Sequence, residues 1–405
     1  MANFIFKKHG DKLLFALALA VLATALIRVV AKPAIQQAKT RDIVFTQWWD
    51  NYLEKDTLTE LIKEFEDTNE GIKIILNPVS YENMHKELTD QSESSVANTI
   101  RGDLFAMDTL WVPAVLEKKI IENADIEVPL LRYINVLYYN VEILKEAGFS
   151  RPPKTRGEFL NYAKALKSEN ANVWALTLGL NSSRGIYDDI FPWMWAAGLE
   201  LIKDGNPAID SRPVTESLSF LASLERDGLI VPGGLQADAE KKLEDFVSGR
   251  AAFMIAPTRD IEFVRERMGE EAFSITSVPV PDNYAGKTYI ASADWTLGVS
   301  AESLLKEETR LFADFVAQKT ETLADKARAI PGNSITGNTK PDPFYSKAWD
   351  IAISGEITRD FNGLQWEQLE KIFYKELSLL FEGTSSPAET ATATHKGWEA
   401  LLLSQ

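Results

Sequence analysis

The chain contains no cysteine and only three histidines. The lack of cysteine excludes disulfide bonds, thiol catalysis and thiolate metal sites. The histidines, His9, His85 and His395, lie far apart in the sequence, and none has the spacing of a zinc site. No serine-histidine signature of a nucleophilic enzyme stands out. We therefore expect neither a metal nor any other cofactor.

Positive charge is also scarce. The chain carries 43 Lys and Arg against 59 Asp and Glu, which gives a formal net charge of -16. Binding to nucleic acid needs clustered Lys and Arg to neutralise phosphates, and no basic patch is present in the sequence. A nucleic-acid partner is therefore excluded.

An apolar run near the N-terminus predicts a targeting segment at residues 1–41. Three lysines precede residues 13–27, which hold no charge, and Arg28 interrupts the run before Val29-Val30-Ala31. Fifteen residues suit the core of a signal peptide, whereas a membrane span needs roughly 20. Because Val29-Val30-Ala31 is only a fair cleavage site, an uncleaved membrane anchor at residues 13–31 is slightly favoured over a cleaved signal. In either case the rest of the chain is exported to the periplasm or the cell surface.

Length and composition indicate two domains. A chain of 405 residues is too long for one ordinary domain and is long enough for two, each with its own core. Hydrophobic residues make up 45% and charged residues 25%, which is typical of a well-folded globular protein.

Residues 128–140 have the pattern of a strand that is buried on both faces. Its centre holds β-branched and aromatic residues, among them Tyr133, Val136 and Tyr138, and turn-forming or helix-starting residues flank it. A short helix ending at Gly148 follows, and then Pro152-Pro153-Lys154-Thr155 leads into a second helix. This strand belongs inside a sheet.

The segment from residue 42 to residue 76 predicts a strand, a helix and a second strand. Residues 42–49 alternate as a strand, residues 57–67 place apolar side chains on one helical face, and a strand at 72–76 follows Asn69-Glu70-Gly71. A unit of this kind forms a parallel pair with a right-handed crossover. Ligands of such sheets bind beyond the carboxyl ends of the strands, so Trp48, Trp49 and Asp50 are expected at the edge of a cleft.

The order of these motifs resembles the extracellular solute-binding proteins of ABC transporters, in the subfamily that includes the maltodextrin binders. The resemblance rests on Val-Pro, Leu-Tyr-Tyr-Asn, Leu-Lys-Glu-Ala-Gly and Pro-Pro-Lys-Thr in sequence, and on further landmarks across residues 43–403. It implies an α/β, two-lobe periplasmic-binding-protein-like fold of type II, in which each lobe is a mostly parallel sheet flanked by helices. The implied lobes are residues 42–131 with 278–318, and residues 132–277 with 319–405.

The same resemblance implies further residues of a ligand site. In the family, strand 128–140 is both hinge and cleft floor, which adds Tyr133 to the candidates. Positions that match ligand-contacting or cleft-facing positions of relatives are Asp108, Trp111, Tyr187, Trp193, Trp195 and Trp295. Trp193 and Trp195 are two residues apart and cannot share a helix face, so at most one should meet the ligand. Arg259 lies in a turn that often carries a tryptophan in relatives, so either a stacking platform is missing there or a hydrogen-bonding or charged contact replaces it.

One departure from the family concerns the wall of the cleft. Only six residues separate Ile121 from Val128, where many relatives have a long excursion. The wall at this point is expected to be lower.

The function implied is capture of a sugar or oligosaccharide for an ABC importer, with the permease subunits as partners. Ten tryptophans and eleven tyrosines suit this ligand because sugar rings pack their C–H faces on aromatic rings. Alternatives within the binding class are a polyamine, an amino acid or a metal ion. A membrane-anchored sensor or adhesive protein of the same fold is another. A glycosidase using Asp188-Asp189, or Asp108 with Asp50, is the enzymatic alternative, but adjacent aspartates before a helix are more often caps.

Overall fold

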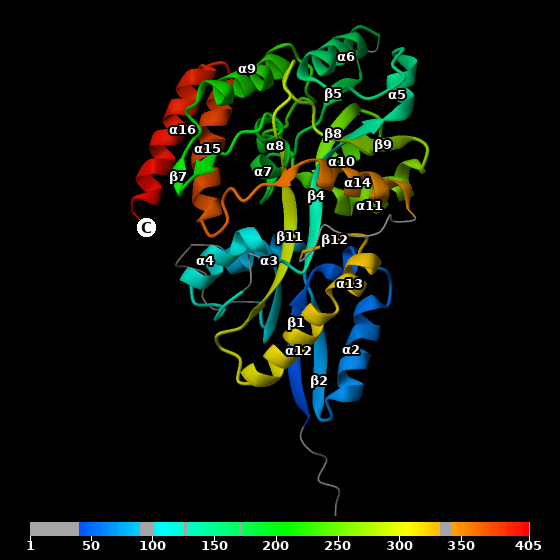
Figure 1. Cartoon of the computed structure of the whole chain (residues 1–405), viewed down its shortest axis with the longest axis vertical. Coiled ribbons are helices and arrows are strands. Elements are labelled where there is room, and N and C mark those ends of the chain that lie inside the picture. Colours follow the sequence, from blue (N-terminus) through cyan, green and yellow to red (C-terminus); the bar gives the residue numbers. More distant parts are fainter. Residues whose placement is uncertain (1–39, 90–99, 125–127, 170–171, 333–341, 405) are drawn as a thin grey trace, which may run out of the picture.

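The fold was analysed in a computed structural model, which describes residues 40–89, 100–124, 128–169, 172–332 and 342–404 (Figure 1). The expected targeting segment lies almost wholly outside these residues. Within the described ranges, no helix is long and apolar enough to cross a membrane.

The first lobe opens with the strand-helix-strand unit expected from the sequence. Strand β1 (Arg41–Gln47) pairs in parallel with β2 (Ile72–Pro78), and helix α2 (Thr57–Thr68) connects them. Leu58, Leu61 and Phe65 of α2 are buried on the face that covers the sheet. The remaining elements of this lobe are η1 (Trp49–Asn51), α3 (Tyr81–Thr89), β3 (Leu104–Asp108), η2 (Thr109–Trp111), α4 (Val112–Glu117), β11 (Ser292–Val299) and α12 (Lys306–Gln318).

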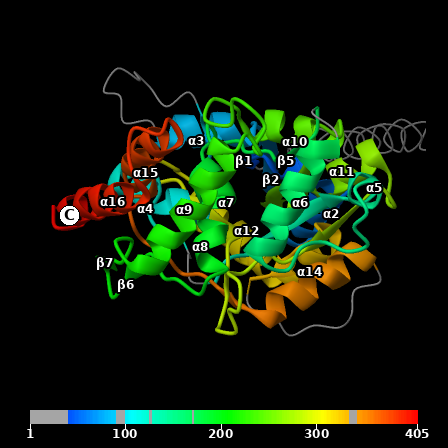
Figure 2. The same cartoon turned by 90° about the horizontal axis from the view of Figure 1, so that it is seen from above.

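The second lobe forms the upper half of Figure 1 and carries most of the helices. Its strands are β5 (Trp174–Leu176), β8 (Ala251–Pro257) and β9 (Phe273–Thr276), with short pairs β6 (Ile202–Lys203), β7 (Asn206–Pro207), β10 (Tyr289–Ile290) and β13 (Glu356–Ile357). Its helices are α5 (Val141–Glu146), α6 (Arg156–Glu169), α7 (Gly185–Asp189), α8 (Phe191–Trp195), α9 (Arg212–Arg226), α10 (Ala239–Val247), η3 (Thr258–Asp260), α11 (Ile261–Met268), α14 (Pro343–Ser354), α15 (Trp366–Phe381) and α16 (Pro387–Leu402). Seen from above, these helices spread around the central strands (Figure 2).

Strand β4 (Leu131–Asn140) joins the two lobes, as the sequence predicts. Its first residues pair with β11 and with β12 (Ile330–Pro331), whereas residues 135–140 pair with β8 and β9. The strands follow one path in the order β2-β1-β3-β11-β4-β8-β5. The central residues of β4 are completely buried, which explains why this strand is apolar on both faces.

The strand pairing is more mixed than the mostly parallel lobes that we predicted. Pairs β1–β2, β1–β3 and β5–β8 are parallel, but β11 runs antiparallel to both β3 and β4, and β4 runs antiparallel to β8 and β9.

The predicted lobe borders stay a prediction, with one observation that bears on them. Helix α13 (Thr320–Lys326), which we assigned to the second lobe, lies beside α12 and α2 in Figure 1. Lys319 just before it pairs with Glu64 of α2, and Lys326 lies 3.8 Å from Glu54. These contacts tie the helix to the first lobe.

Candidate functional site

Seven aromatic side chains gather where the first lobe faces the second. This aromatic cluster consists of Trp48, Trp49, Tyr52, Tyr81, Trp111, Tyr133 and Trp295. Trp295 lies at its centre and stacks on Trp49, with the ring centroids 5.5 Å apart and the planes 10° from parallel. Trp48 contacts Trp111 at 5.0 Å on the other side. Residues from β1, β4 and β11 thus meet at one place.

The sheet topology explains this gathering. Trp48 and Trp49 directly follow β1, Tyr81 lies three residues after the end of β2, and Trp111 follows β3. Parallel neighbouring strands bring their carboxyl ends to one edge, so the residues that follow them lie close together. Trp295 reaches the same edge because it pairs with Asp108 at the end of β3 and with Leu131 of β4.

Five of the aromatic residues predicted for the site belong to this cluster, namely Trp48, Trp49, Trp111, Tyr133 and Trp295. Sequence analysis missed Tyr52 and Tyr81. The signal for both was available, because each follows a parallel strand by a few residues, just as Trp48 and Trp49 do.

A buried ion-pair network connects the two lobes beside the cluster. Arg184, which precedes α7, donates from Nη1 to Asp108 of the first lobe at 3.0 Å and from Nη2 to Asp188 at 3.1 Å. The Tyr81 hydroxyl also donates to Asp108, at 2.9 Å. Asn135 of β4 donates to Asp188 at 2.8 Å. The lobes are therefore in contact across the interface, in a closed arrangement.

The charges in this network compensate one another. Burial alone would raise the pKa of Asp188, but the adjacent Arg184 guanidinium outweighs burial and holds this pKa below its usual value. Burial would lower the pKa of Arg184, whereas Asp108 and Asp188 hold it above its usual value. Asp188 is therefore ionised at neutral pH and lies beside a charged Arg184.

The adjacent aspartates Asp188 and Asp189 serve different cations. Asp189 accepts from Lys242 Nζ at 2.6 Å and from the Gly179 backbone at 2.6 Å, on the side away from Arg184. Burial raises the pKa of Asp189 to about 6, although Lys242 opposes this shift. The two carboxylates consequently do not face each other as an acid-base pair would.

Arg259 reaches the aromatic cluster from the second lobe. Its guanidinium lies 5.1 Å from the ring of Tyr81 and 5.5 Å from the ring of Tyr52, in the geometry of cation–π contacts. The side chain is 10% exposed, and its nearest carboxylate, Asp260, is 3.9 Å from Nε. That distance is beyond a hydrogen bond.

Several buried polar atoms of this region are free to bond a ligand. Among the described residues, none accepts a hydrogen bond from the indole N–H of Trp48, Trp49, Trp111 or Trp295, or from Nε and Nη1 of Arg259. Within the same ranges, Oδ1 of Asn135 and both carboxylate oxygens of Glu367 lack a donor. Buried polar groups are normally paired, so a concentration of this kind is typical of a binding site.

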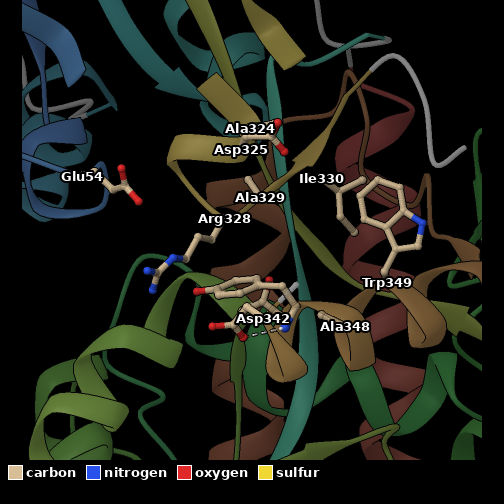
Figure 3. A pocket seen from close by; sticks show the side chains of 11 residues that line it. Glu54, Ala324, Asp325, Arg328, Ala329, Ile330, Asp342, Ala348 and Trp349 are labelled. Atoms are coloured by element: carbon tan, nitrogen blue, oxygen red, sulfur yellow. Dashed lines mark hydrogen bonds between the residues drawn. The ribbon is translucent and has the colours of Figure 1, made fainter. Parts of the chain in front are cut away.

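Two cavities adjoin this region. One of about 470 Å³ is lined by residues of both lobes, including Tyr52, Leu53, Arg259 and Phe263. The other, of about 370 Å³, is shown in Figure 3, where Glu54 of the first lobe faces Arg328 and the helix that carries Trp349. Volumes of 300 to 1,000 Å³ at a domain interface are typical of pockets for small molecules.

The other predicted site residues lie outside the aromatic cluster. Asp50 is exposed and accepts from Gln47 Nε2 at 2.8 Å. Tyr187 is buried beneath Arg184, whose guanidinium lies 4.4 Å from its ring. It borders the interlobe network without entering the cluster.

Trp193 and Trp195 are both fully buried within the second lobe. Trp193 packs against Phe159 and Phe220, and Trp195 donates from Nε1 to Asp360 at 2.7 Å. Neither contacts the aromatic cluster. Their role in ligand binding stays a prediction, without a contact in this closed arrangement to support it.

Comparison with known proteins agrees with this architecture. Residues 50–322 match the family model described as bacterial extracellular solute-binding protein. An ABC transporter-binding protein of Deinococcus radiodurans is 25% identical over 295 residues, which cover 68% of each chain.

Solved structures show the same fold. The GacH receptor of Streptomyces glaucescens, determined unliganded and with acarbose, has a TM-score of 0.72 at 16% identity, covering 90% of this chain and 99% of its own. An ABC substrate-binding protein of Listeria monocytogenes, determined with cycloalternan, has a TM-score of 0.70 at 15% identity and the same coverage. The predicted resemblance is thereby confirmed. Because the family model covers more than half of the chain, this protein belongs to the bacterial extracellular solute-binding proteins, which bind solutes outside the cytoplasm and are not enzymes.

Proposed function

We propose that this protein is the substrate-binding component of an ABC importer and that it captures a sugar or oligosaccharide between its lobes by hinge closure. The observation that supports this most is the aromatic cluster at the lobe interface, whose four indole N–H groups lack acceptors among the described residues. Aromatic faces pack on sugar rings, and the indole N–H groups can donate to sugar hydroxyls. Solved proteins of this fold that bind acarbose and cycloalternan support the ligand class.

The acidic residues of the interface argue against a polyamine. Asp108 and Asp188 are both bonded to Arg184, and Asp294 forms a two-pronged pair with Arg132 at 2.8 and 2.9 Å. A cationic ligand at any of these three carboxylates would have to displace Arg184 or Arg132, and burying it beside these arginines would be unfavourable.

Hinge closure is supported by the way in which the lobes are joined. β4 runs from one lobe into the other, while Arg184 and Arg259 of the second lobe reach residues of the first. A ligand that bonds groups from both lobes binds the closed form more tightly and so shifts the equilibrium towards closure. The permease subunits would recognise that closed form.

We also propose that residues 13–31 anchor the protein to the cytoplasmic membrane, on its outer side. Residues 13–31 are 19 residues with a single arginine, close to the roughly 20 that a span needs, and Val29-Val30-Ala31 is only a fair cleavage site. Membrane retention of the full chain after export tests this, and recovery of a processed, freely released protein would contradict it.

The function is tested by titrating intrinsic tryptophan fluorescence of the full chain with mono- and oligosaccharides, using polyamines and amino acids as controls. Closure should change the surroundings of several tryptophans at once, so a saturable change with one sugar class is expected. A response to a polyamine alone would overturn the sugar assignment. A protein that binds sugar but does not associate with any permease would support the sensor alternative.

A further inference from the structure

The inference concerns Arg259 and deepens the proposed function, on which it rests. Two of the guanidinium's nitrogens, Nε and Nη1, are buried without an acceptor in the part of the chain that the structure describes. A buried charged donor without a partner is costly, and a native protein keeps one only where something else bonds it. The position of the side chain suggests what that is, because it lies at the interface of the lobes and lines the 470 Å³ cavity.

Within the described ranges, no residue accepts a hydrogen bond from Nε or Nη1 of Arg259. Asp260 approaches Nε only to 3.9 Å, and Tyr52 and Tyr81 offer ring faces rather than acceptor atoms. Arg184, the other buried arginine of the interface, is fully bonded to Asp108 and Asp188. The two arginines therefore differ in kind, since Arg184 joins the lobes whereas Arg259 keeps its donors free.

Two of the acidic residues that line the cavity are already engaged by cations. Glu262 pairs with Arg328, and Glu54 lies 3.8 Å from Lys326. Among the described cations that line this cavity, Arg259 is the one with buried nitrogens, Nε and Nη1, that have no hydrogen-bond acceptor. An oxyanion entering the cavity would meet the charge of Arg259 beside the ring of Tyr52.

The remaining free groups define the rest of the ligand. The carboxylate of Glu367 accepts no hydrogen bond from the described residues, but its Oε1 lies within ion-pair range of His85, 3.6 Å from Nε2, and the His85 ring contacts Trp111 at 5.2 Å. A carboxylate accepts hydrogen bonds only, so the ligand must supply hydroxyl donors there. The site therefore calls for acceptors at Arg259 and for hydroxyl groups near Trp111.

We propose that the ligand is an acidic saccharide, and that Arg259 binds its oxyanion while the aromatic cluster packs on the sugar rings. A carboxylate, as in a uronic acid, and a sugar phosphate share this chemistry. The planar guanidinium can hold either one through two parallel N–H···O bonds.

The test compares ligands that differ only in charge. The full chain is titrated calorimetrically with trigalacturonate, with the neutral galactose trisaccharide of the same linkage, and with galactose 6-phosphate. We expect at least one acidic ligand to bind about 10- to 100-fold more tightly than the neutral trisaccharide, with an affinity that falls as salt is raised. The acidic ligand that binds better identifies the source of the oxyanion.

Variants show whether Arg259 is responsible. Arg259→Gln should remove the preference for the acidic ligand, and Arg259→Lys should restore part of it, because lysine keeps the charge but not the fork. Arg267→Gln is the matched control, since Arg267 lies on α11 in an exposed pair with Glu244 and should change nothing. Thermal melting checks that each variant folds, and the salt dependence of the wild type needs no variant.

The outcomes separate this inference from the proposed function. The neutral and the acidic trisaccharide could bind with equal affinity, and Arg259→Gln could change both affinities by the same factor. That result would overturn the assignment of an acidic ligand and leave sugar binding in place. Binding of glutamate or inorganic phosphate without any saccharide would overturn the proposed function and with it the acidic saccharide. Failure of every saccharide to bind would overturn both.

Discussion

The pair between Asp108 and Arg184 should control whether the lobes stay closed. Asp108 is completely buried at the end of β3, Arg184 has 3% of its side chain exposed, and they belong to different lobes. When the lobes separate, both charges regain water. The pair therefore acts on the closing equilibrium more than on the stability of either lobe.

The magnitude follows from the bonds that are lost. Asp108→Asn removes the charge that Arg184 contacts at 3.0 and 3.2 Å, while Asp188 still holds the other side of the guanidinium. Hydrogen bonds to charged groups contribute about 1.5 to 3 kcal/mol, and 1.4 kcal/mol is a factor of ten. We expect Asp108→Asn to shift the closing equilibrium about 10- to 100-fold towards the open form.

Two measurements check this expectation. Ligand affinity should fall by up to this factor, and by less the more the closed form dominates in the unliganded wild type, because only the closed form contacts the ligand from both lobes. The radius of gyration from small-angle scattering should increase in the unliganded or partly liganded protein. Combining Asp108→Asn with Arg184→Gln should give less than the sum of the single effects, since both remove one interaction.

A matched control lies on the surface of the second lobe. Glu158 and Arg151 also form an ion pair, at 2.6 Å, but their side chains are 33% and 46% exposed and both belong to one lobe. Glu158→Gln should leave affinity and radius of gyration unchanged. If Asp108→Asn behaves like this control in both measurements, the interlobe pair does not govern closure.

Further predictions concern the tryptophans and the pH dependence of stability. Trp111→Ala and Trp295→Ala should weaken ligand binding while the fold remains intact by circular dichroism, and unchanged affinity in both would remove them from the site. Trp193→Ala should instead lower the free energy of unfolding by about 3 to 5 kcal/mol, measured by denaturant titration, because its indole is buried in the core of the second lobe. Asp189 has a pKa of about 6 in the folded protein, above the unfolded value of about 3.9, so the folded state binds the proton more tightly. Its contribution to stability should therefore be lost as pH rises from 4 to 6, by up to about 3 kcal/mol. Asp189→Asn should remove this slope from the wild-type curve, and identical curves would contradict the assignment.

The sequence was most informative where local pattern and topology agree. The helix expected at residues 57–67 is α2 (Thr57–Thr68), and the doubly buried strand at residues 128–140 is β4 (Leu131–Asn140). Periodicity identified both, because a helix with one apolar face and a strand with two buried faces have different repeats. The positions of Trp48 and Trp49 also followed from the rule that parallel strands end at a ligand-binding edge.

Local sequence pattern could not tell which aromatic and charged residues belong to the candidate site, because this depends on partners far away in the sequence. In the sequence, Trp193 and Trp195 are tryptophans at positions that match cleft-facing positions of relatives, as Trp111 and Trp295 are. In the structure, Trp193 and Trp195 pack inside the second lobe. Arg184 gave no signal at all, although it joins the lobes through Asp108, 76 residues away in the sequence. Whether an aromatic ring faces a core or a cleft depends on what the opposite lobe places against it.

By itself, the sequence determined the elements, the crossover strand and the acidic, cysteine-free composition that excludes thiol chemistry and nucleic-acid binding. These properties depend on residues near one another in the chain or on sums over it. Only the tertiary structure decided that Arg184 is hydrogen-bonded by two carboxylates, whereas Nε and Nη1 of Arg259 have no acceptor among the described residues. The physical reason is that the charge state and the hydrogen bonds of a buried group are set by its neighbours in space, and in this protein those neighbours come from the other lobe.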